Sequence, residues 1–462
     1  MTDDEPTEVV TVFLRNAGEV VLLRRSDEVG SSPGRWGGVA GHAEREAAAI
    51  EGSEASEGRP ARDRRSLGPC EQRGAKPRGP CERAEPAKGR RSREQTGSGA
   101  TRERSDPDGA AHEEIREETG IDPATLDLVR RGEPFPVEDG EYAWRVHPYL
   151  FDCTTREVET NDETAGYEWV PPTEILRRET SEASERRAGE ARETVPDLWT
   201  SYDRLRPTPG TIAEDAEHGS SYLSLRALEC LRDEAAIAVE RAGDWEDLAS
   251  VARDLRSARP SMAVVANRVN RAMHEASGER DAVERAAVEG HRRAREADAG
   301  AATLDPDWDR VLTLSRSGTV RRALLGATAL ERVFVAESRP AREGVGVAER
   351  LAGEYRVTLH TDAAVAHVLA THQVDAVVVG ADAVLADGSV VNKTGTRSAA
   401  LAADREDVPL HAVCAADKIS PDEEPRLEAP GLVTAVRTER GPLDTGGIRA
   451  VAREHADLAG WE

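Results

Sequence analysis

The chain has 462 residues, and 87 acidic side chains outnumber 62 basic ones, giving a formal net charge of −25. Such an acidic surface is typical of proteins that stay soluble in concentrated salt, and it argues against binding to nucleic acid or an anionic membrane. No apolar run near 18 residues and no signal-peptide pattern is present, so we expect a cytoplasmic protein. Lysine is scarce and occurs only at Lys76, Lys88, Lys393 and Lys418.

The first 120 residues carry a hairpin pattern, a glycine-rich segment and an acidic helix. Residues 8–24 are two β-rich runs joined by Asn16-Ala17-Gly18, and residues 35–42 form a glycine-rich strand and turn. On a helix, Glu114, Glu117 and Glu118 stand at positions i, i+3 and i+4 and share one face. Their mutual repulsion would be offset by a hard divalent cation with oxygen ligands, and Gly120 is placed to end the helix.

The order of these segments resembles the Nudix hydrolases, whose motif is Gx5Ex7REUxEExGU, where U is aliphatic. Residues that fall on motif positions are Glu114, Glu117, Glu118, Gly120 and Ile121, with Gly41 as the motif glycine. Glu113 stands where the motif has arginine. The resemblance implies an α/β/α sandwich with a mixed sheet, in which the three glutamates hold Mg²⁺ (or Mn²⁺) and act catalytically. It also implies hydrolysis of a nucleoside-diphosphate derivative.

Two polar segments interrupt this domain, which we place at residues 1–203. Residues 44–105 are rich in Gly, Pro, Ser, Arg and Glu and are predicted to be a disordered insert. A basic nucleic-acid tail is the alternative, but we favour a neutral insertion in a surface loop. Residues 179–192 form a second polar insert, and residues 204–210 (RLRPTPG) form a linker.

The second half of the chain changes from helical spacing to alternating strands and helices. We expect a helical subdomain at 211–305 and a doubly wound, Rossmann-like parallel sheet at 306–462. Apolar runs at 311–315, 333–336, 357–360, 377–379 and 410–413 are its predicted strands. The run Ala376–Val379 leads directly into Asp382, and residues 392–396 open a helix. In such sheets ligands lie outside the carboxyl ends of the strands.

Polar side chains follow each of these strands and predict a site for a phosphorylated small molecule. Ser315 and Asp382 are among the polar residues at these strand ends. The predicted phosphate-binding residues are Ser317, Gly318, Arg339, Asn392, Lys393, Gly395, Thr396 and Lys418, joined by Gly219 at the head of the first long helix. A plain helix cap explains the segment around Gly219 equally well.

The segments SRSGTV, ESRPAREG, TDAAVAHV and GADAVLADGSVVNKTGT, with the later Asp-Lys pair, resemble the translation initiation factor 2B alpha/beta/delta family. That family includes ribose-1,5-bisphosphate and methylthioribose-1-phosphate isomerases, in which a cysteine and an aspartate move protons. Asp382 matches the aspartate, whereas Ser315 stands at the cysteine position. His218-Gly219-Ser220 stands at the Arg-Gly-Ala phosphate motif. Serine is a far weaker acid than cysteine, so it is a poor substitute for cysteine in proton transfer. The SRSGTV segment is more similar to the non-catalytic, regulatory branch of the family.

Three functions remain open. We favour a Nudix hydrolase whose C-terminal domain binds a sugar phosphate or nucleotide without turning it over. The alternatives are a bifunctional enzyme with an aldose–ketose isomerase domain, and a non-catalytic protein similar to translation initiation factor 2B. In each case we expect small-molecule partners, with no membrane or nucleic acid, and homo-oligomers formed through the C-terminal domain.

Overall fold

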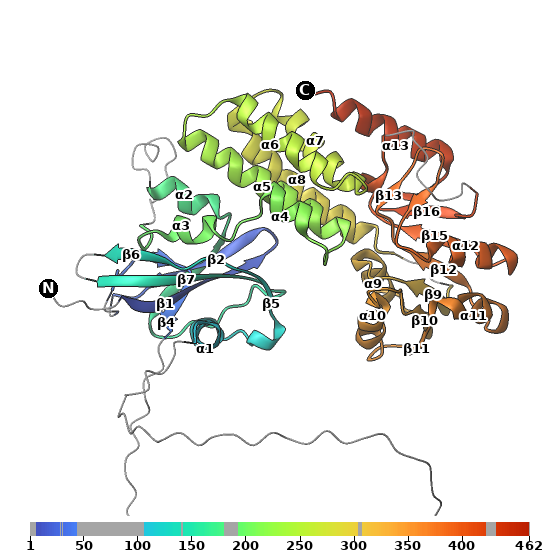
Figure 1. Cartoon of the computed structure of the whole chain (residues 1–462), viewed down its shortest axis with the longest axis horizontal. Coiled ribbons are helices and arrows are strands. Elements are labelled where there is room, and N and C mark those ends of the chain that lie inside the picture. Colours follow the sequence, from blue (N-terminus) through green and yellow to red (C-terminus); the bar gives the residue numbers. More distant parts are fainter. Residues whose placement is uncertain are drawn as a thin grey trace, which may run out of the picture.

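The computed structural model describes residues 6–27, 29, 31–43, 106–139, 142–179, 193–303, 307–421 and 431–461. The predicted insert at 44–105 and all but the first residue of that at 179–192 lie outside these ranges. Figure 1 shows three parts in a row: a β-rich N-terminal domain, a group of helices in the middle, and an α/β domain that ends the chain. Among the described residues, no helix is both long and apolar enough to span a membrane.

The N-terminal domain is built on one mixed eight-stranded sheet. Its central order is β3-β2-β1-β7-β5, with β4 against β1, β6 against β7 and β8 against β2. The pair β1–β7 is parallel and the other pairs are antiparallel. The strands are β1 (Thr7–Asn16), β2 (Glu19–Arg25), β3 (Trp36–Gly37), β4 (Val39–His42), β5 (Asp127–Arg131), β6 (Phe135–Asp139), β7 (Tyr142–Asp152) and β8 (Thr164–Val170).

Helices cover both faces of this sheet because β1 sends alternate apolar side chains to opposite sides. Val12 and Leu14 pack in the same core as Ile115 of α1 (Pro107–Thr119). Phe13 points the other way and packs in the core that contains Trp199 of α3 (Leu198–Asp203) and residues of α2 (Thr173–Glu179). The predicted α/β/α sandwich is therefore confirmed, as is the hairpin, in which Asn16 pairs with Glu19.

The middle part is a bundle of five helices that share one apolar core. They are α4 (Pro209–Glu214), α5 (Ser220–Glu240), α6 (Trp245–Ala258), α7 (Ala263–Ala276) and α8 (Arg280–Gly300). The connection at 204–210 is packed rather than free: Leu205 is buried in the N-terminal core, and Thr208 caps α4 through a reciprocal pair of hydrogen bonds with Thr211. The two parts are therefore joined through a packed segment.

The C-terminal domain is the predicted doubly wound sheet, with strand order β11-β10-β9-β12-β15-β16-β17. All neighbouring pairs are parallel except β16–β17. The strands are β9 (Arg310–Leu314), β10 (Arg332–Ala336), β11 (Arg356–His360), β12 (Ala376–Val379), β15 (Leu410–Val413), β16 (Ala435–Thr438) and β17 (Gly441–Leu443). A separate short hairpin pairs β13 (Ala383–Val384) with β14 (Val390–Val391).

Helices lie on both faces of this sheet because successive residues of a strand face opposite cores. Val377 and Val379 pack with α11 (Val365–Thr371), α12 (Thr396–Arg405) and α13 (Thr445–Leu458), while Ala376 and Val378 pack with α9 (Gly318–Leu325) and α10 (Glu343–Leu351). Strand order reverses between β9 and β12, since β10 and β11 lie on one side of β9 and β15 lies beyond β12. This switch point is where doubly wound sheets hold ligands.

Candidate functional site

The three predicted metal-binding glutamates lie on α1, next to the glycine-rich strand. Glu118 is buried, with 8% of its surface exposed, and its Oε2 accepts a hydrogen bond of 3.1 Å from the backbone N–H of Ala40. Glu114 is half-buried and Glu117 is exposed. A Cβ at Gly41 would lie 1.7 Å from Oε1 of Glu114. A side chain at position 41 would therefore displace the Glu114 carboxylate from its place beside the strand.

Crowding and burial alter the protonation of these acids. Burial and, to a smaller extent, repulsion from Glu114 raise the pKa of Glu118 to about 8, against the lowering effect of the Ala40 hydrogen bond. Burial also raises the pKa of Glu114 to about 7, with added repulsion from Glu117 and Glu163. Arg25 opposes the shift at Glu118, but its attraction is smaller than the repulsion from Glu114.

Carboxylate oxygens match the ligand preference of Mg²⁺ or Mn²⁺, and a bound cation would favour the ionised form of these acids. In the described ranges, however, no three His, Cys, Asp or Glu side chains already form a group that could hold a metal ion. The donor chemistry of Glu114, Glu117 and Glu118 fits a hard cation, while the structure itself contains no preformed cage among the residues it describes.

The predicted C-terminal site lies beside the carboxyl ends of β9, β10 and β12. Three non-glycine residues there have left-handed backbone conformations: Ser315 (φ +65°), Ser338 (φ +61°) and Arg342 (φ +57°). Such residues cost free energy and are frequent at functional sites. The N–H of Ser315 donates to Oγ of Ser338 at 2.7 Å, and both N–H groups of Ser338 and Arg339 donate to the Asp362 carboxylate.

Glu343, at the start of α10, connects two of the predicted site residues. Its Oε2 accepts a hydrogen bond of 3.1 Å from Oγ of Ser315, and its Oε1 accepts one of 2.8 Å from Nζ of Lys393. Burial favours the neutral acid, but Lys393 outweighs this effect and the pKa of Glu343 is lowered. Sequence analysis did not single out Glu343, and nothing in chain order indicates that it lies between Ser315 and Lys393.

Asp382 receives a partner from the helical subdomain. Oγ of Ser220, the first residue of α5, donates to Oδ1 of Asp382 at 3.0 Å, and Ser220 is 2% exposed. The neighbouring loops approach closely, because a Cβ at Gly380 would lie 2.6 Å from Oγ of Ser317. Ser317 itself caps α9 by accepting from the N–H of Val320.

The remaining predicted residues occupy the edges of this cluster. Arg339 is exposed and pairs with Glu337 at 3.0 Å. Lys418 is buried, with 4% of its surface exposed, and its Nζ donates to the carbonyl of Ala381 at 2.7 Å, which holds the loop carrying Asp382. Four residues lie at the starts of α5, α9 and α12: Gly219, Gly318, Gly395 and Thr396. A Cβ at any of these glycines would meet nothing within 4 Å, so space remains open beside all three helix starts. Asn392 donates to Oγ1 of Thr396 at 3.0 Å.

A buried ionic network connects the N-terminal domain to the helical subdomain. Arg15 of β1 is 2% exposed and lies between Asp152 of β7, at 2.6 Å, and Glu229 of α5, at 3.1 Å. The hydroxyl of Tyr222 on α5 also donates to Asp152 at 3.1 Å. These contacts join residues 70 to 214 positions apart in the chain, and sequence analysis did not predict them.

These features define a two-domain protein: an acidic helix over a mixed sheet, and a doubly wound domain whose strand ends carry a polar cluster. Residues 82–192 match the family model of the NUDIX domain, and residues 216–428 match that of the Initiation factor 2 subunit family. The chain therefore contains a NUDIX domain followed by a domain of the initiation factor 2 subunit family, as the two motif sets predicted.

Similar proteins match parts of the chain. Methylthioribose-1-phosphate isomerase of Gemmatimonas aurantiaca is 35% identical over 130 residues, covering 25% of this chain and 38% of that protein. The same enzyme of Bacillus pumilus is 28% identical over 189 residues, covering 36% and 53%. Translation initiation factor 2B of Pyrococcus horikoshii OT3 is a solved structure with 23% identity, covering 51% of this chain and 94% of that one, at a TM-score of 0.45. The chain thus spans 38% and 53% of the lengths of these two isomerases.

Proposed function

We propose that the N-terminal domain is a divalent-cation-dependent hydrolase of a nucleoside-diphosphate derivative. The observation that carries this proposal is the placement of Glu118: buried, fixed by the N–H of Ala40, and adjacent to a second acid, Glu114, with a raised pKa. Two acids whose ionised forms are disfavoured by burial do not stabilise a helix that serves only a structural role. The arrangement is explained if the acids serve a cation and a reacting water.

In this proposal the glutamates of α1 have different roles. Mg²⁺ or Mn²⁺, when bound, would supply positive charge to the diphosphate and lower the pKa of the attacking water. Glu118 cannot turn away from the site because Ala40 holds its carboxylate. Glu114, with a pKa of about 7, is suited to accept a proton from the attacking water. The oxygen of that water bonds to phosphorus while the bridging P–O bond breaks. The products are a nucleoside monophosphate and a second phosphomonoester.

A panel of nucleoside-diphosphate derivatives, assayed with and without Mg²⁺ or Mn²⁺, tests this proposal. Glu117→Gln and Glu118→Gln should each abolish hydrolysis and leave the circular dichroism spectrum unchanged. Glu113→Gln is the matched control, since Glu113 is exposed on the same helix. If no derivative is hydrolysed by wild type, or if the glutamine variants keep full activity, the hydrolase assignment is wrong.

For the C-terminal domain we propose binding of a sugar phosphate or nucleotide. Lys393, with 38% of its side chain exposed, and the N–H groups at the start of α12 would hold the phosphate, and Asp382 would accept a sugar hydroxyl. A phosphate must then compete with Glu343 for Lys393, and with Glu337 for Arg339. The pairs keep these cations neutralised until a ligand of higher charge arrives.

An aldose–ketose isomerase is the second candidate for this domain. Two observations favour it: Ser315 has a carboxylate within 3.1 Å that could accept its proton, and the relatives named above are isomerases. Asp382→Asn should then abolish turnover of a ribose phosphate while binding persists. If wild type binds sugar phosphates without converting them, the domain is a binding module, and a non-catalytic role similar to that of the initiation factors becomes the better proposal.

Homo-oligomers formed through the C-terminal domain are also part of this proposal. Leu359 on the edge strand β11 and Leu401 on α12 are large apolar side chains of this domain that are 43% and 51% exposed. Sedimentation velocity of wild type and of Leu401→Glu would test whether Leu401 lies at an interface between copies.

A further inference from the structure

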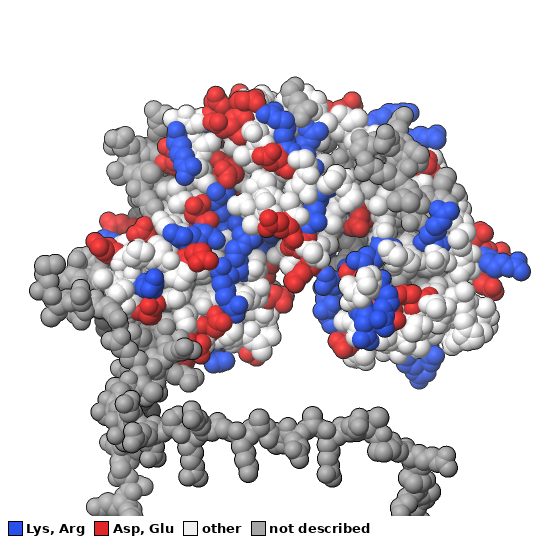
Figure 2. Space-filling model, viewed as in Figure 1, with Lys and Arg blue, Asp and Glu red and all other residues white. Residues whose placement is uncertain are grey.

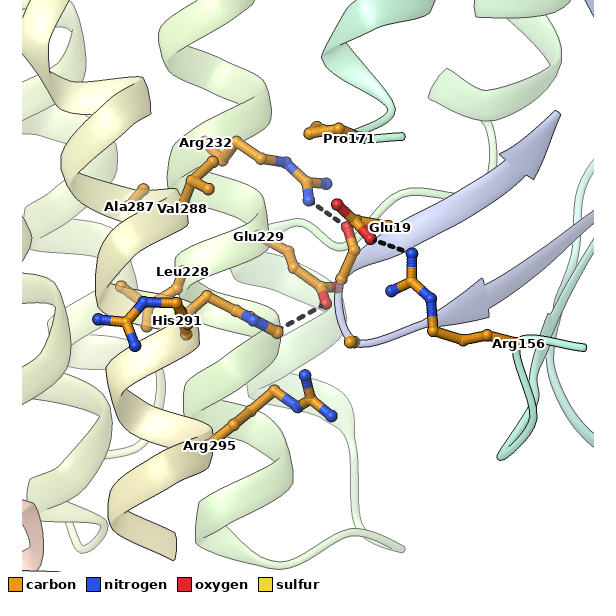
Figure 3. A pocket seen from close by; sticks show the side chains of 13 residues that line it. Glu19, Arg156, Pro171, Leu228, Glu229, Arg232, Ala287, Val288, His291 and Arg295 are labelled. Carbon is orange, nitrogen blue, oxygen red and sulfur yellow. Dashed lines mark hydrogen bonds and ion pairs between the residues drawn. The ribbon is translucent and has the colours of Figure 1, made fainter. Parts of the chain in front are cut away.

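A pocket of about 230 Å³ lies at the junction of the N-terminal domain and the helical subdomain (Figure 3). One side is the turn of the β1–β2 hairpin, and the other is formed by α5 and α8. None of the residues that line it belongs to the acidic cluster of α1 or to the strand ends of the C-terminal sheet. Neither candidate site described above therefore accounts for it.

The lining is cationic in a chain whose overall charge is strongly negative. Four arginines and one histidine face two acids across the pocket. The arginines are Arg156, Arg232, Arg292 and Arg295, the histidine is His291, whose pKa is lowered by burial, and the acids are Glu19 and Glu229. Figure 2 shows basic side chains gathered along this junction, where the β-rich domain meets the helices. With acids exceeding bases by 25 over the whole chain, such a concentration requires an explanation.

The acid on α5 does not offset this positive charge. Glu229 is buried and is already paired with Arg15 at 3.1 Å and with Arg226 at 2.7 Å, two cations that do not line the pocket. Burial alone would raise the pKa of Glu229, but these arginines hold it far below its ordinary value. The charge of Glu229 is therefore balanced by two arginines that lie outside the pocket.

Three of the four arginines are paired with acids, and one is not. Arg232 pairs with Asp233 at 2.7 Å and donates to the carbonyl of Gly18 at 2.5 Å, and Arg156 pairs with Glu19 at 2.7 Å. Arg292 pairs with Glu289 at 2.6 Å and with Glu296. His291 is 7% exposed, and its Nε2 lies 3.2 Å from Glu229 without forming a hydrogen bond. Within the described ranges Arg295, one turn along α8 from His291, makes no ion pair or hydrogen bond, and it extends toward the hairpin in Figure 3.

The rest of the wall is apolar. Val288 is 40% exposed, and Leu228, Ala287 and Pro171 lie beside it. An arginine with no anion and an uncovered valine in one pocket suit a ligand with an anionic group and an uncharged body. The volume, below that of ordinary drug-sized sites, admits one phosphate with a small body rather than a dinucleotide.

We propose that this junction pocket is a binding site for a compact phosphomonoester of the nucleoside-monophosphate class. Its phosphate would contact Arg295 and the neighbouring His291, and its body would cover Val288. The site is separate from the phosphate site proposed at the C-terminal sheet. Because the lining comes from both the hairpin and α8, an occupied pocket ties the two parts of the chain together.

Calorimetric titration of the full chain tests the site with three probes: AMP, inorganic phosphate and adenosine. The titrations use a Lys393→Ala background, which removes the proposed C-terminal phosphate site. AMP should bind, phosphate should bind more weakly, and adenosine should not bind measurably. Arg295→Glu should weaken AMP binding by roughly tenfold or more. Arg285→Glu changes an exposed arginine on the same helix that does not line the pocket, and it should stay within about twofold of the background.

A second variant tests the apolar wall of the pocket independently of the charge on Arg295. Val288→Trp fills the apolar side of the pocket without altering its charge, and it should weaken AMP more than it weakens inorganic phosphate. If Arg295→Glu and Val288→Trp both bind AMP as the background does, or if Lys393→Ala alone removes all AMP binding, the pocket is not a ligand site. If adenosine binds as tightly as AMP, the proposed ligand class is wrong.

Discussion

Ser220 donates a hydrogen bond of 3.0 Å to Asp382, although 162 positions separate them in the chain. Ser220 is the first residue of α5, a helix of 21 residues, and Asp382 follows the central strand of the C-terminal sheet. Further along α5, Glu229 pairs with Arg15 of the N-terminal domain. One helix therefore touches the candidate sugar-phosphate site at its start and the NUDIX domain two to three turns later. A shift of α5 would therefore move residues at both the candidate sugar-phosphate site and the contact with the NUDIX domain.

The Ser220 contact yields the first prediction. Ser220→Ala leaves Asp382 without this donor, so the carboxylate is less well fixed for a sugar hydroxyl. A net hydrogen bond of about 0.5–1.5 kcal/mol corresponds to a loss of roughly twofold to tenfold in sugar-phosphate affinity. Calorimetry measures it, and Ser221→Ala is the control, since Ser221 has only a 3.5 Å contact with Asp298. Equal affinities for Ser220→Ala and wild type would show that Asp382 does not depend on α5.

A second prediction concerns the competition for Lys393. Glu343→Gln removes the negative partner 2.8 Å from Nζ, so a ligand phosphate no longer displaces an ion pair and should bind several-fold more tightly. Lys393→Ala should weaken binding strongly. Lys393→Arg should weaken it less, because a planar guanidinium keeps the charge but does not fit the crowded loop as the compact ammonium does.

Titration of ribose 5-phosphate into the three variants and wild type decides this point. If Lys393→Arg binds as well as wild type, the claim that a guanidinium fits the crowded loop less well than an ammonium is wrong. If Glu343→Gln binds more weakly than wild type, Glu343 contacts the ligand itself and does not merely restrain the lysine.

Local features of the fold could be predicted from sequence because their causes are local. Gly120 ends α1 with a φ of +67°, as its position after the helix indicated. The apolar run before Gly380 forms a strand, Ala376–Val379, that is buried on both faces. The polar residues after these strands could be assigned to one edge of the sheet because parallel strands end on the same side.

The pairings inside the sites could not be predicted in the same way. Glu343 lies 28 positions from Ser315 and 50 from Lys393, and only the packed fold brings the three together. Scarcity of lysine drew attention to Lys418, yet composition cannot show that its ammonium is buried against the carbonyl of Ala381. Arg15 is one of many arginines in the sequence, and its role at the domain junction depends on contacts 137 and 214 positions away.

The raised pKa of Glu118 gives a prediction about pH. The folded state binds this proton up to about pH 8 and the unfolded state only to 4.5, so the free energy of unfolding falls as the pH rises between those values. The loss is at most on the order of 5 kcal/mol. Glu118→Gln keeps an acceptor for Ala40 and carries no charge, so without metal it should melt at a higher temperature than wild type at pH 8 and nearly the same at pH 4.5.

Metal provides the complementary measurement. Mg²⁺ should raise the melting temperature of wild type more at pH 8 than at pH 6, because protons compete for the same carboxylates. The increase should be much smaller in Glu118→Gln and unchanged in Glu113→Gln. Parallel melting curves for wild type and Glu118→Gln across this pH range would mean that Glu118 is not protonated in the folded state.

The final prediction concerns residues 44–105, whose removal the described structure makes feasible. Ala43 and Asp106 flank this segment, and the N–H of Asp106 donates to the carbonyl of Ala43 at 3.2 Å. Ala43 is itself held by a 2.8 Å hydrogen bond from its N–H to the carbonyl of Glu8 on β1. The two ends are therefore fixed side by side. A Gly-Ser turn of about four residues could join them without moving β4 or α1.

Such a deletion should leave the fold intact and slightly stabilise it. Each doubling of loop length costs about 0.6 kcal/mol of closure entropy, so reducing the 62 residues from 44 to 105 to about four gains at most on the order of 2 kcal/mol. Thermal unfolding of the two chains measures this difference. Hydrolase activity should persist, because Glu114, Glu117, Glu118 and Ala40 all lie outside the segment. A fall in melting temperature of several degrees, or loss of activity in a folded deletion variant, would show that the segment contributes to the domain in a way that its composition does not indicate.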